Sequence, residues 1–144
     1  MASSVKNLSD YTSKNVKNIS ESKFAIVVSE WNEEVTEALY QGAYETLISH
    51  GAKKENILRK SVPGSFELSL AAQWMAKEEI IDAVICICDA VAHGITNVSL
   101  KYDKPVIFGV LTPNTQKQAL DRAGGKHGNK GDEAAITAIK MLGF

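Results

Sequence analysis

Apolar residues occur in this chain in two patterns: short continuous runs, and longer segments in which they recur every three or four positions. Continuous runs are typical of strands buried on both faces, as in a parallel sheet. Recurrence at every third or fourth position predicts helices. Four runs predict strands, at residues 23–29, 57–62, 82–87 and 105–111. Because helical segments separate them, the sequence predicts an α/β layer fold with one parallel sheet and right-handed crossovers.

The predicted helices begin and end at residues suited to those positions. In the first, apolar residues recur every four positions from Val35 to Leu47, after Asn32 as a candidate N-cap and before Gly51 as a stop. A later helix is predicted to begin with Pro113 in its first turn, where proline is tolerated. The remaining helices are predicted at residues 66–77, 89–98 and 134–142.

Residues 1–22 contain too few apolar residues to build a core and predict an N-terminal arm. The pattern favours a disordered terminus, and the alternative is a segment that lies along another surface. The rest of the 144-residue chain is long enough for one hydrophobic core and too short for two, and it contains no internal repeat. We therefore expect residues 23–144 to form a single α/β domain.

Composition excludes several classes of partner. The formal net charge is −1 and the isoelectric point lies near 6.3, so the basic footprint of a nucleic-acid-binding protein is missing. No apolar run has the length of a membrane span, and the first 22 residues lack the apolar core of a secretory signal. Two cysteines without such a signal fit a reducing compartment. These observations predict a cytoplasmic protein with no nucleic-acid or membrane partner.

The segment Ser61–Leu68 reads as the turn between a strand and a helix. Pro63-Gly64 marks a tight turn, since proline fixes one backbone angle and glycine permits unusual ones. Ser65 is then predicted to cap the next helix, with Phe66 and Glu67 exposed beside it. Ligands of open parallel sheets bind beyond the carboxyl ends of the strands, where this turn lies. An ordinary strand–helix connection fits the same residues equally well.

Two further features could carry chemistry, and each has a plain structural alternative. A large aromatic side chain such as Trp31 at a strand–helix junction more often packs in the core. The glycine-rich stretch 124–131 could hold an anion through its backbone N–H groups, helped by Arg122, Lys126 and Lys130. It is neither a P-loop nor a dinucleotide fingerprint, and a solvated basic turn fits it equally well.

Histidines and cysteines form no recognisable catalytic or metal-binding pattern. His50, His93 and His127 lie in separate predicted segments, with no Ser/His/Asp order or paired-carboxylate motif beside them. Cys86 and Cys88 alternate along a predicted strand and share one of its faces. Without a second Cys or His pair at metal spacing, they are interpreted as small core residues.

Five motifs stand in the order and approximate spacing of one known family. They are Trp31-Asn32, VPGSFEL at 62–68, PVIFGVLT at 105–112, QALDRAG at 118–124 and GNKG at 128–131, followed by an alanine-rich helix. Together they resemble the lumazine synthases, which catalyse the penultimate step of riboflavin biosynthesis. The resemblance extends from Phe24 to Leu142.

The resemblance implies a fold, an assembly and a reaction. The fold is a flavodoxin-like three-layer sandwich with a four-stranded parallel sheet and an N-terminal arm, assembled as a homopentamer or as a larger icosahedral shell. The reaction condenses 5-amino-6-(D-ribitylamino)uracil with 3,4-dihydroxy-2-butanone 4-phosphate to give 6,7-dimethyl-8-ribityllumazine, phosphate and water. Neither a cofactor nor a metal ion is expected.

The resemblance also implies roles for residues at the pyrimidine end of the site. Trp31 would stack on the pyrimidine ring, whose flat face suits an aromatic side chain. Asn32 and the turn of Ser65, Phe66 and Glu67 would hold the ring and the ribityl hydroxyls through polar contacts.

The resemblance implies roles for three more residues, in the wall of the substrate pocket and at the end of the pocket that binds the phosphate. Phe108 would come from the neighbouring subunit as part of the pocket wall. Arg122 would bind the phosphate with its planar fork of donors, and Lys130 would add positive charge nearby.

One departure from the family concerns catalysis. Family members continue after the third strand through a glycine-rich turn, a phosphate-binding step and a helix start that contains the proton-transferring histidine. Here Ile87 is followed directly by Cys88 and a sequence that resembles the later half of that helix. His93 matches a non-catalytic helix position and His127 lies in a different loop, so neither inherits the role, and the catalytic residue is unknown.

Two explanations of this departure stay open. Either the complete protein contains a segment between Ile87 and Cys88 that this sequence lacks, which the family-like flanks favour, or the protein is truly shortened there. The first predicts the enzyme. The second allows a non-catalytic, ligand-binding assembly protein of the same fold.

Overall fold

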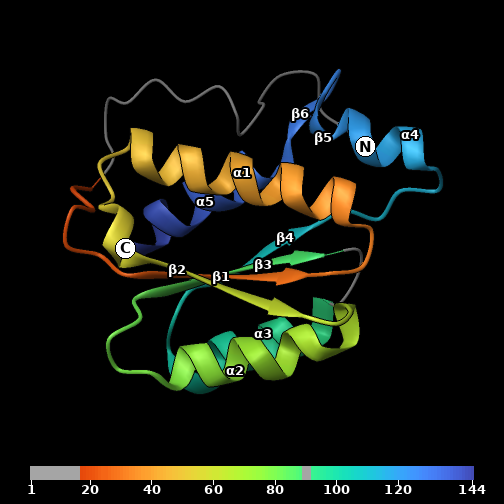
Figure 1. Cartoon of the computed structure of the whole chain (residues 1–144). Helices are drawn as coiled ribbons and strands as arrows, with labels where there is room; N and C mark the ends of the chain where they lie inside the picture. Colours follow the sequence, from red (N-terminus) through yellow and green to blue (C-terminus); the bar gives the residue numbers. More distant parts are fainter. Residues whose placement is uncertain (1–16, 89–91) are drawn as a thin grey trace.

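The computed structural model describes residues 17–88 and 92–144, and its centre is a four-stranded parallel sheet (Figure 1). The strand order is β2-β1-β3-β4, and all three pairings are parallel. The strands are β1 (Phe24–Ser29), β2 (Ile57–Val62), β3 (Ala83–Cys88) and β4 (Val106–Val110). The predicted α/β fold with a four-stranded parallel sheet is therefore confirmed.

Burial on both faces of the sheet explains the continuous apolar runs. Every residue of β1 and β3 is buried, and successive side chains enter two separate core clusters. In β3, Ile85 and Ile87 pack on one face, whereas Cys86 and Cys88 pack on the other. The interpretation of the two cysteines as core residues is confirmed. The edge strand β2 differs, because its middle residues are exposed.

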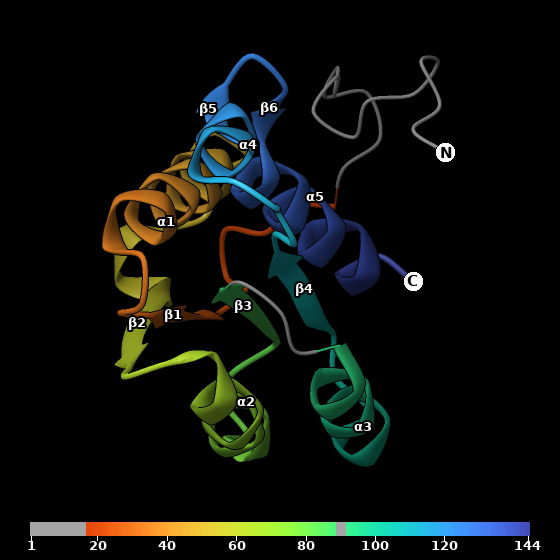
Figure 2. The same cartoon turned by 90° about the vertical axis from the view of Figure 1, so that its right-hand side faces the viewer.

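Two helices cover each face of the sheet and make the fold a three-layer sandwich (Figure 2). α1 (Glu33–Ser49) and α5 (Lys130–Leu142) lie on one face, and α2 (Leu68–Lys77) and α3 (Ala92–Tyr102) lie on the other. The residues expected to face the core of α1, from Val35 to Leu47, are buried. No helix in the described parts of the chain is long and apolar enough to cross a membrane.

The segment after β4 folds differently from the prediction. Pro113 precedes the helix instead of entering it, since α4 (Gln116–Asp121) begins after Thr115, whose side chain accepts a hydrogen bond from the Gln118 N–H at 3.2 Å. A side-chain cap of this kind fixes the helix start. The sequence signal that was missed is this threonine.

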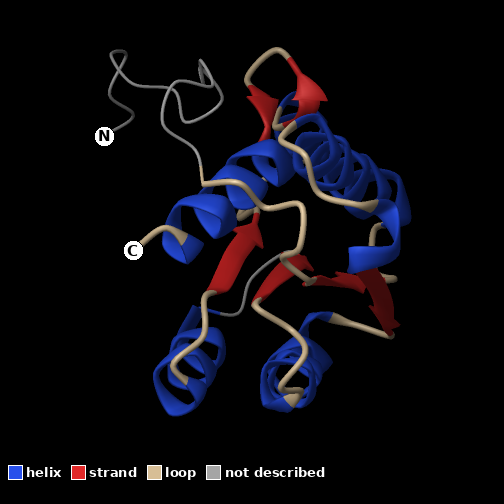
Figure 3. Ribbon diagram, turned by 90° about the vertical axis from the view of Figure 1, so that its left-hand side faces the viewer, coloured by secondary structure: helices blue, strands red, loops and turns tan. Residues whose placement is uncertain are grey.

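The glycine-rich stretch is a small antiparallel hairpin rather than a loop (Figure 3). It consists of β5 (Ala123–Gly125) and β6 (Gly128–Asn129). Gly124 and Gly128 have φ angles of 105° and 78°, which glycine adopts without the steric cost that other residues incur. These two glycines let the chain reverse within a few residues. Single-turn helices at Lys54–Asn56 and Ser65–Glu67 complete the fold.

The last residues of the expected arm pack against the domain. Ile19 is fully buried in the core cluster beneath α1 and α5. The Lys17 ammonium donates to the carbonyl of Leu142, at the end of α5, over 2.6 Å. Residues 1–16, which make up most of the predicted arm, lie outside the described residues.

Candidate active site

The ends of β1 and β2 place two aromatic side chains at one edge of the sheet. The strands are neighbours, and beyond their last pair the Glu30 N–H still donates to the carbonyl of Val62 at 2.8 Å. Trp31 follows β1 and is 71% exposed, while Phe66 follows β2 and is 91% exposed. The expectation that Trp31 packs in the core is wrong, because the chain leaves the sheet at Ser29, whose hydroxyl accepts from the Trp31 N–H.

The turn after β2 is built differently from the prediction, although it exposes the expected residues. Ser65 does not cap α2; it begins a single-turn helix, Ser65–Glu67, that leads directly into α2. Neither helix start has a side-chain cap. Phe66 and Glu67 are both exposed, as predicted, at the carboxyl edge of the sheet.

Asn32 connects the first helix with the segment after β4. Its backbone is left-handed (φ 60°, ψ 54°), and its carbonyl, not its side chain, accepts hydrogen bonds from the start of α1. Asn32 is therefore the N-cap residue of α1, as predicted, but its side chain makes no capping hydrogen bond. The side-chain amide pairs instead with that of Gln116 through two reciprocal hydrogen bonds of 3.2 and 3.1 Å. This pair joins the start of α1 to the start of α4.

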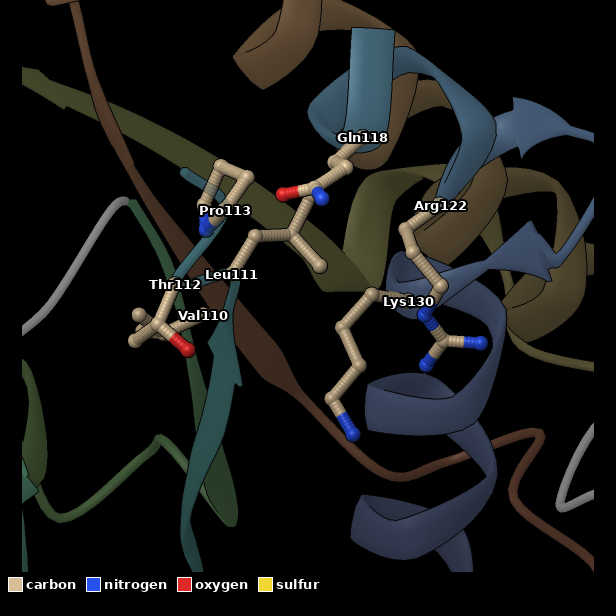
Figure 4. Close-up of a pocket in the computed structure, with 7 residues that line it drawn as sticks. All are labelled: Val110, Leu111, Thr112, Pro113, Gln118, Arg122 and Lys130. Atoms are coloured by element: carbon tan, nitrogen blue, oxygen red, sulfur yellow. The ribbon is translucent and has the colours of Figure 1, made fainter. Parts of the chain in front are cut away.

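A cavity of about 340 Å³ opens at the carboxyl end of β4 (Figure 4). Its lining combines the end of the strand with a polar and a cationic wall: Val110, Leu111, Thr112, Pro113, Gln118, Arg122 and Lys130. The volume lies in the range of small-molecule sites. Two cations in a hollow with an apolar wall suit a small anionic ligand.

The hairpin brings the two cations of this cavity together. Arg122 follows α4 as its C-cap residue and Lys130 begins α5, and the Lys130 N–H donates to the carbonyl of Arg122 at 2.9 Å. Of the three basic residues predicted to help hold an anion, Arg122 and Lys130 line the cavity. Lys126 lies exposed at the tip of the hairpin and does not line it.

Glu133 is a site residue that the sequence reasoning missed. Glu133 is 6% exposed, and its carboxylate accepts from the Arg122 guanidinium at 2.6 Å and from the Lys130 ammonium at 2.9 Å. Burial alone would raise the pKa of Glu133, but these two hydrogen bonds outweigh it and hold the pKa below its ordinary value. Arg122 also donates to the carbonyl of His127 at 2.7 Å. The available signal was the spacing, since an acid three residues after Lys130 lies on the same helix face.

Phe108 lies apart from Trp31 and the Ser65–Glu67 turn within one chain. It is in the middle of the edge strand β4, is 37% exposed, and lines a separate hollow of about 320 Å³ that also includes Lys130. Strand β3 separates β4 from β1, after which Trp31 lies. One chain thus forms an aromatic group around Trp31 and a cationic group around Arg122, and Phe108 shares a hollow with the cationic group only through Lys130.

The structure also describes the two residues, Ile87 and Cys88, between which this chain is expected to lack a segment that family members contain. Ile87 and Cys88 are consecutive residues of β3, opposite Gly109 and Val110 of β4. Residues 89–91 lie outside the description. Among the residues described, no group of three or more His, Cys, Asp or Glu side chains could hold a metal ion.

Comparison with known proteins identifies relatives over the whole length of the chain. The model of the family described as 6,7-dimethyl-8-ribityllumazine synthase matches residues 21–144. A protein of that name from Cytophaga hutchinsonii is 58% identical, over 99% of this chain and 98% of the relative. Proteins of the same name from Parabacteroides distasonis and Phocaeicola vulgatus are each 49% identical, over 100% of this chain and 99% and 94% of the relatives.

The alignment with the Cytophaga relative extends over 156 positions, which is more than the 144 residues of this chain. The relative therefore has residues where this chain has none. This agrees with the expectation that the chain lacks a segment that other members of the family contain.

Proposed function

The chain belongs to the 6,7-dimethyl-8-ribityllumazine synthase family, and from this premise we propose that it condenses 5-amino-6-(D-ribitylamino)uracil with 3,4-dihydroxy-2-butanone 4-phosphate. The amine attacks the ketone and water is lost to form an imine, phosphate is eliminated, and ring closure completes the lumazine with loss of a second water. All three relatives described above carry the name of this enzyme. None of them favours a non-catalytic binding protein.

The paired cations at the end of β4 carry the assignment of the phosphate end. Arg122 and Lys130 line the same cavity, and a hydrogen bond of 2.9 Å from the Lys130 N–H to the Arg122 carbonyl oxygen holds their backbones together. The guanidinium matches phosphate oxygens with two parallel donors, and the ammonium adds a point charge. Both side chains then balance the charge that grows on the phosphate as it leaves.

The turns after β1 and β2 supply the residues that bind the pyrimidine substrate. Trp31 offers an uncovered aromatic face for stacking on the pyrimidine ring. Asn32 offers an amide to the ring, because its two hydrogen bonds to Gln116 use only one of its two N–H donors and one of the two lone pairs on its oxygen. The exposed turn Ser65–Glu67 offers polar groups to the ribityl hydroxyls.

Completion of the pocket requires a second subunit. Phe108 is separated from Trp31 by β3, so a single chain does not bring both into one pocket. We propose that Phe108 of a neighbouring copy closes the wall, within a homopentamer or a larger shell. We propose that the assembly works in the cytoplasm without a cofactor.

Proton transfer is assigned to no residue of this chain. By the family resemblance, the histidine that serves this step belongs to the segment that is missing between Ile87 and Cys88. The described residues therefore contribute binding, orientation and charge balance. Holding two reactants in register is itself a large part of the catalysis of a condensation.

Substitution of Arg122 by lysine tests the proposal. A charge-assisted hydrogen bond contributes about 1.5–3 kcal/mol, or about 10- to 100-fold in a rate or equilibrium constant. Arg122→Lys should therefore raise KM for the phosphorylated butanone, or lower kcat, by about that factor. The KM for the ribitylaminouracil should change little, and Lys126→Ala, at the hairpin tip, is the matched control.

The assay is product formation by the full-length protein with both substrates, followed by chromatography against authentic lumazine. If the wild type makes no lumazine, the proposed activity is wrong. If it does and Arg122→Lys behaves like the wild type, the phosphate site lies elsewhere.

A further inference from the structure

The acid that holds the two cations is unusual in its burial. Glu133 is 6% exposed, although glutamate is almost never buried unless it is paired. It lies in the first turn of α5, where the positive end of the helix favours a carboxylate. Both of its oxygens are used, one by Arg122 and the other by Lys130. The carboxylate therefore has fixed partners on both sides.

The contacts of Glu133 leave most donors of the two cations available for a ligand. Arginine has five N–H donors, and those to Glu133 and to the His127 carbonyl use two of them. The ammonium of Lys130 has three donors, and Glu133 takes one. Since both side chains line the cavity, their other donors can reach a phosphate placed there.

We propose that Glu133 is a positioning residue for the phosphorylated substrate, a role that rests on the function proposed above. It never touches the substrate. It holds Arg122 and Lys130 together at the cavity before the phosphate arrives. Two long, flexible side chains then need not be ordered during binding, and such ordering costs affinity.

Positioning and simple electrostatics predict opposite signs when the charge of Glu133 is removed. Glu133→Gln raises the positive charge beside the cavity by one unit, so electrostatics alone predicts tighter phosphate binding. An amide, however, has only one acceptor oxygen, and its NH₂ group repels whichever cation it faces. One of the two cations is then released from its place. If positioning dominates, phosphate binds about tenfold more weakly, because one long side chain must be ordered on binding.

The test is isothermal titration calorimetry of the full-length protein with inorganic phosphate, at constant ionic strength. We expect Kd to rise about tenfold in Glu133→Gln. The matched control is Asp132→Asn, which removes a charge from the same helix turn at a residue that does not line the cavity. Its Kd should stay within about twofold of the wild type. In the enzymatic assay, Glu133→Gln should raise KM for the phosphorylated butanone and leave KM for the ribitylaminouracil unchanged.

The outcomes separate this role from a purely structural one. Phosphate that binds to Glu133→Gln as tightly as to the wild type, or more tightly, overturns the positioning role even if the variant is less stable. Wild-type protein that binds no phosphate overturns the phosphate site and the positioning role together. If Glu133→Gln does not fold, as judged by circular dichroism, Glu133→Asp takes its place. Its carboxylate is withdrawn by one methylene, so it should also weaken binding, and wild-type affinity in this variant overturns the proposal.

Discussion

Gly131 has no room for a side chain, and its replacement by alanine should destabilise the subunit. A Cβ at this position would lie 2.8 Å from the carbonyl carbon and closer still to the carbonyl oxygen of Leu39, and 2.9 Å from the amide nitrogen of Ala43. All of these are backbone atoms of α1, which cannot rotate away as a side chain can. Gly131→Ala therefore forces α5 away from α1.

Two opposing effects decide the magnitude. Alanine favours a helix over glycine by up to about 1 kcal/mol, which would stabilise α5 if there were space. Overpacking of a filled interior typically costs about 1–3 kcal/mol, and a rigid backbone neighbour places this site at the upper end. The movement also separates the buried residues that α1 and α5 share in one core cluster. We expect a net loss of about 2 kcal/mol and a Tm lower by about 4–12 °C.

The assay is denaturant and thermal unfolding followed by circular dichroism, at fixed subunit concentration. Gly143→Ala is the matched control, because a Cβ there meets its nearest neighbour, the Lys140 carbonyl oxygen, at an ordinary 3.4 Å. Its stability should stay within about 0.5 kcal/mol of the wild type. Gly131→Ala should also weaken phosphate binding, because α5 carries Lys130 and Glu133. A Gly131→Ala variant as stable as the wild type would refute the close approach of the two helices.

Two further predictions concern the arm and acid stability. Removal of residues 1–16 should weaken assembly, as measured by light scattering, because an arm can add a strand to the sheet edge of a neighbouring subunit. The subunit fold should stay intact, because Ile19, which packs in the core, is kept. Unchanged assembly would count against a role for the arm. The pKa of Glu133 is lowered from its ordinary value of 4.5, so Glu133 contributes stability that is lost as the pH falls below 4.5. Burial raises the pKa of Asp132, so the ionised Asp132 changes the free energy of unfolding in the opposite sense. The free energy of unfolding should therefore fall more steeply below pH 4.5 in the wild type than in Glu133→Gln, and equal slopes would contradict this.

The strands and long helices could be predicted from the sequence because one simple pattern determines each of them. Strand β2 was predicted at residues 57–62, where the structure has it, and β1 and β3 were each within one residue of their true ends. Predictions failed where only one or two residues decide the local geometry. Thr115 caps α4 and thereby excludes Pro113 from the helix, and two glycines with positive φ turn an expected loop into a hairpin.

The cationic half of the site could be predicted, and the burial of its acid could not. Arg122 and Lys130 flank a glycine-rich stretch, so their charge and spacing were visible in the sequence. Glu133 lies in a first helical turn, where acids are common for reasons that need no burial. Only the packing of α5 against the hairpin and the sheet buries this carboxylate between the two cations.

The exposed aromatic side chains at the carboxyl edge argue that one chain is only part of the functional unit. Trp31 and Phe66 are 71% and 91% exposed, although the strands that they follow, β1 and β2, are hydrogen-bonded to each other within the sheet. Exposed apolar surface of this kind usually marks a surface that binds something else. Phe108, on the far edge strand, is 37% exposed and lines a separate hollow. If the edge strand of one copy faces the carboxyl edge of the next, a single contact covers all three side chains and closes the pyrimidine pocket. Assembly and substrate binding then depend on the same surface, so a substitution such as Phe108→Ala should weaken both together.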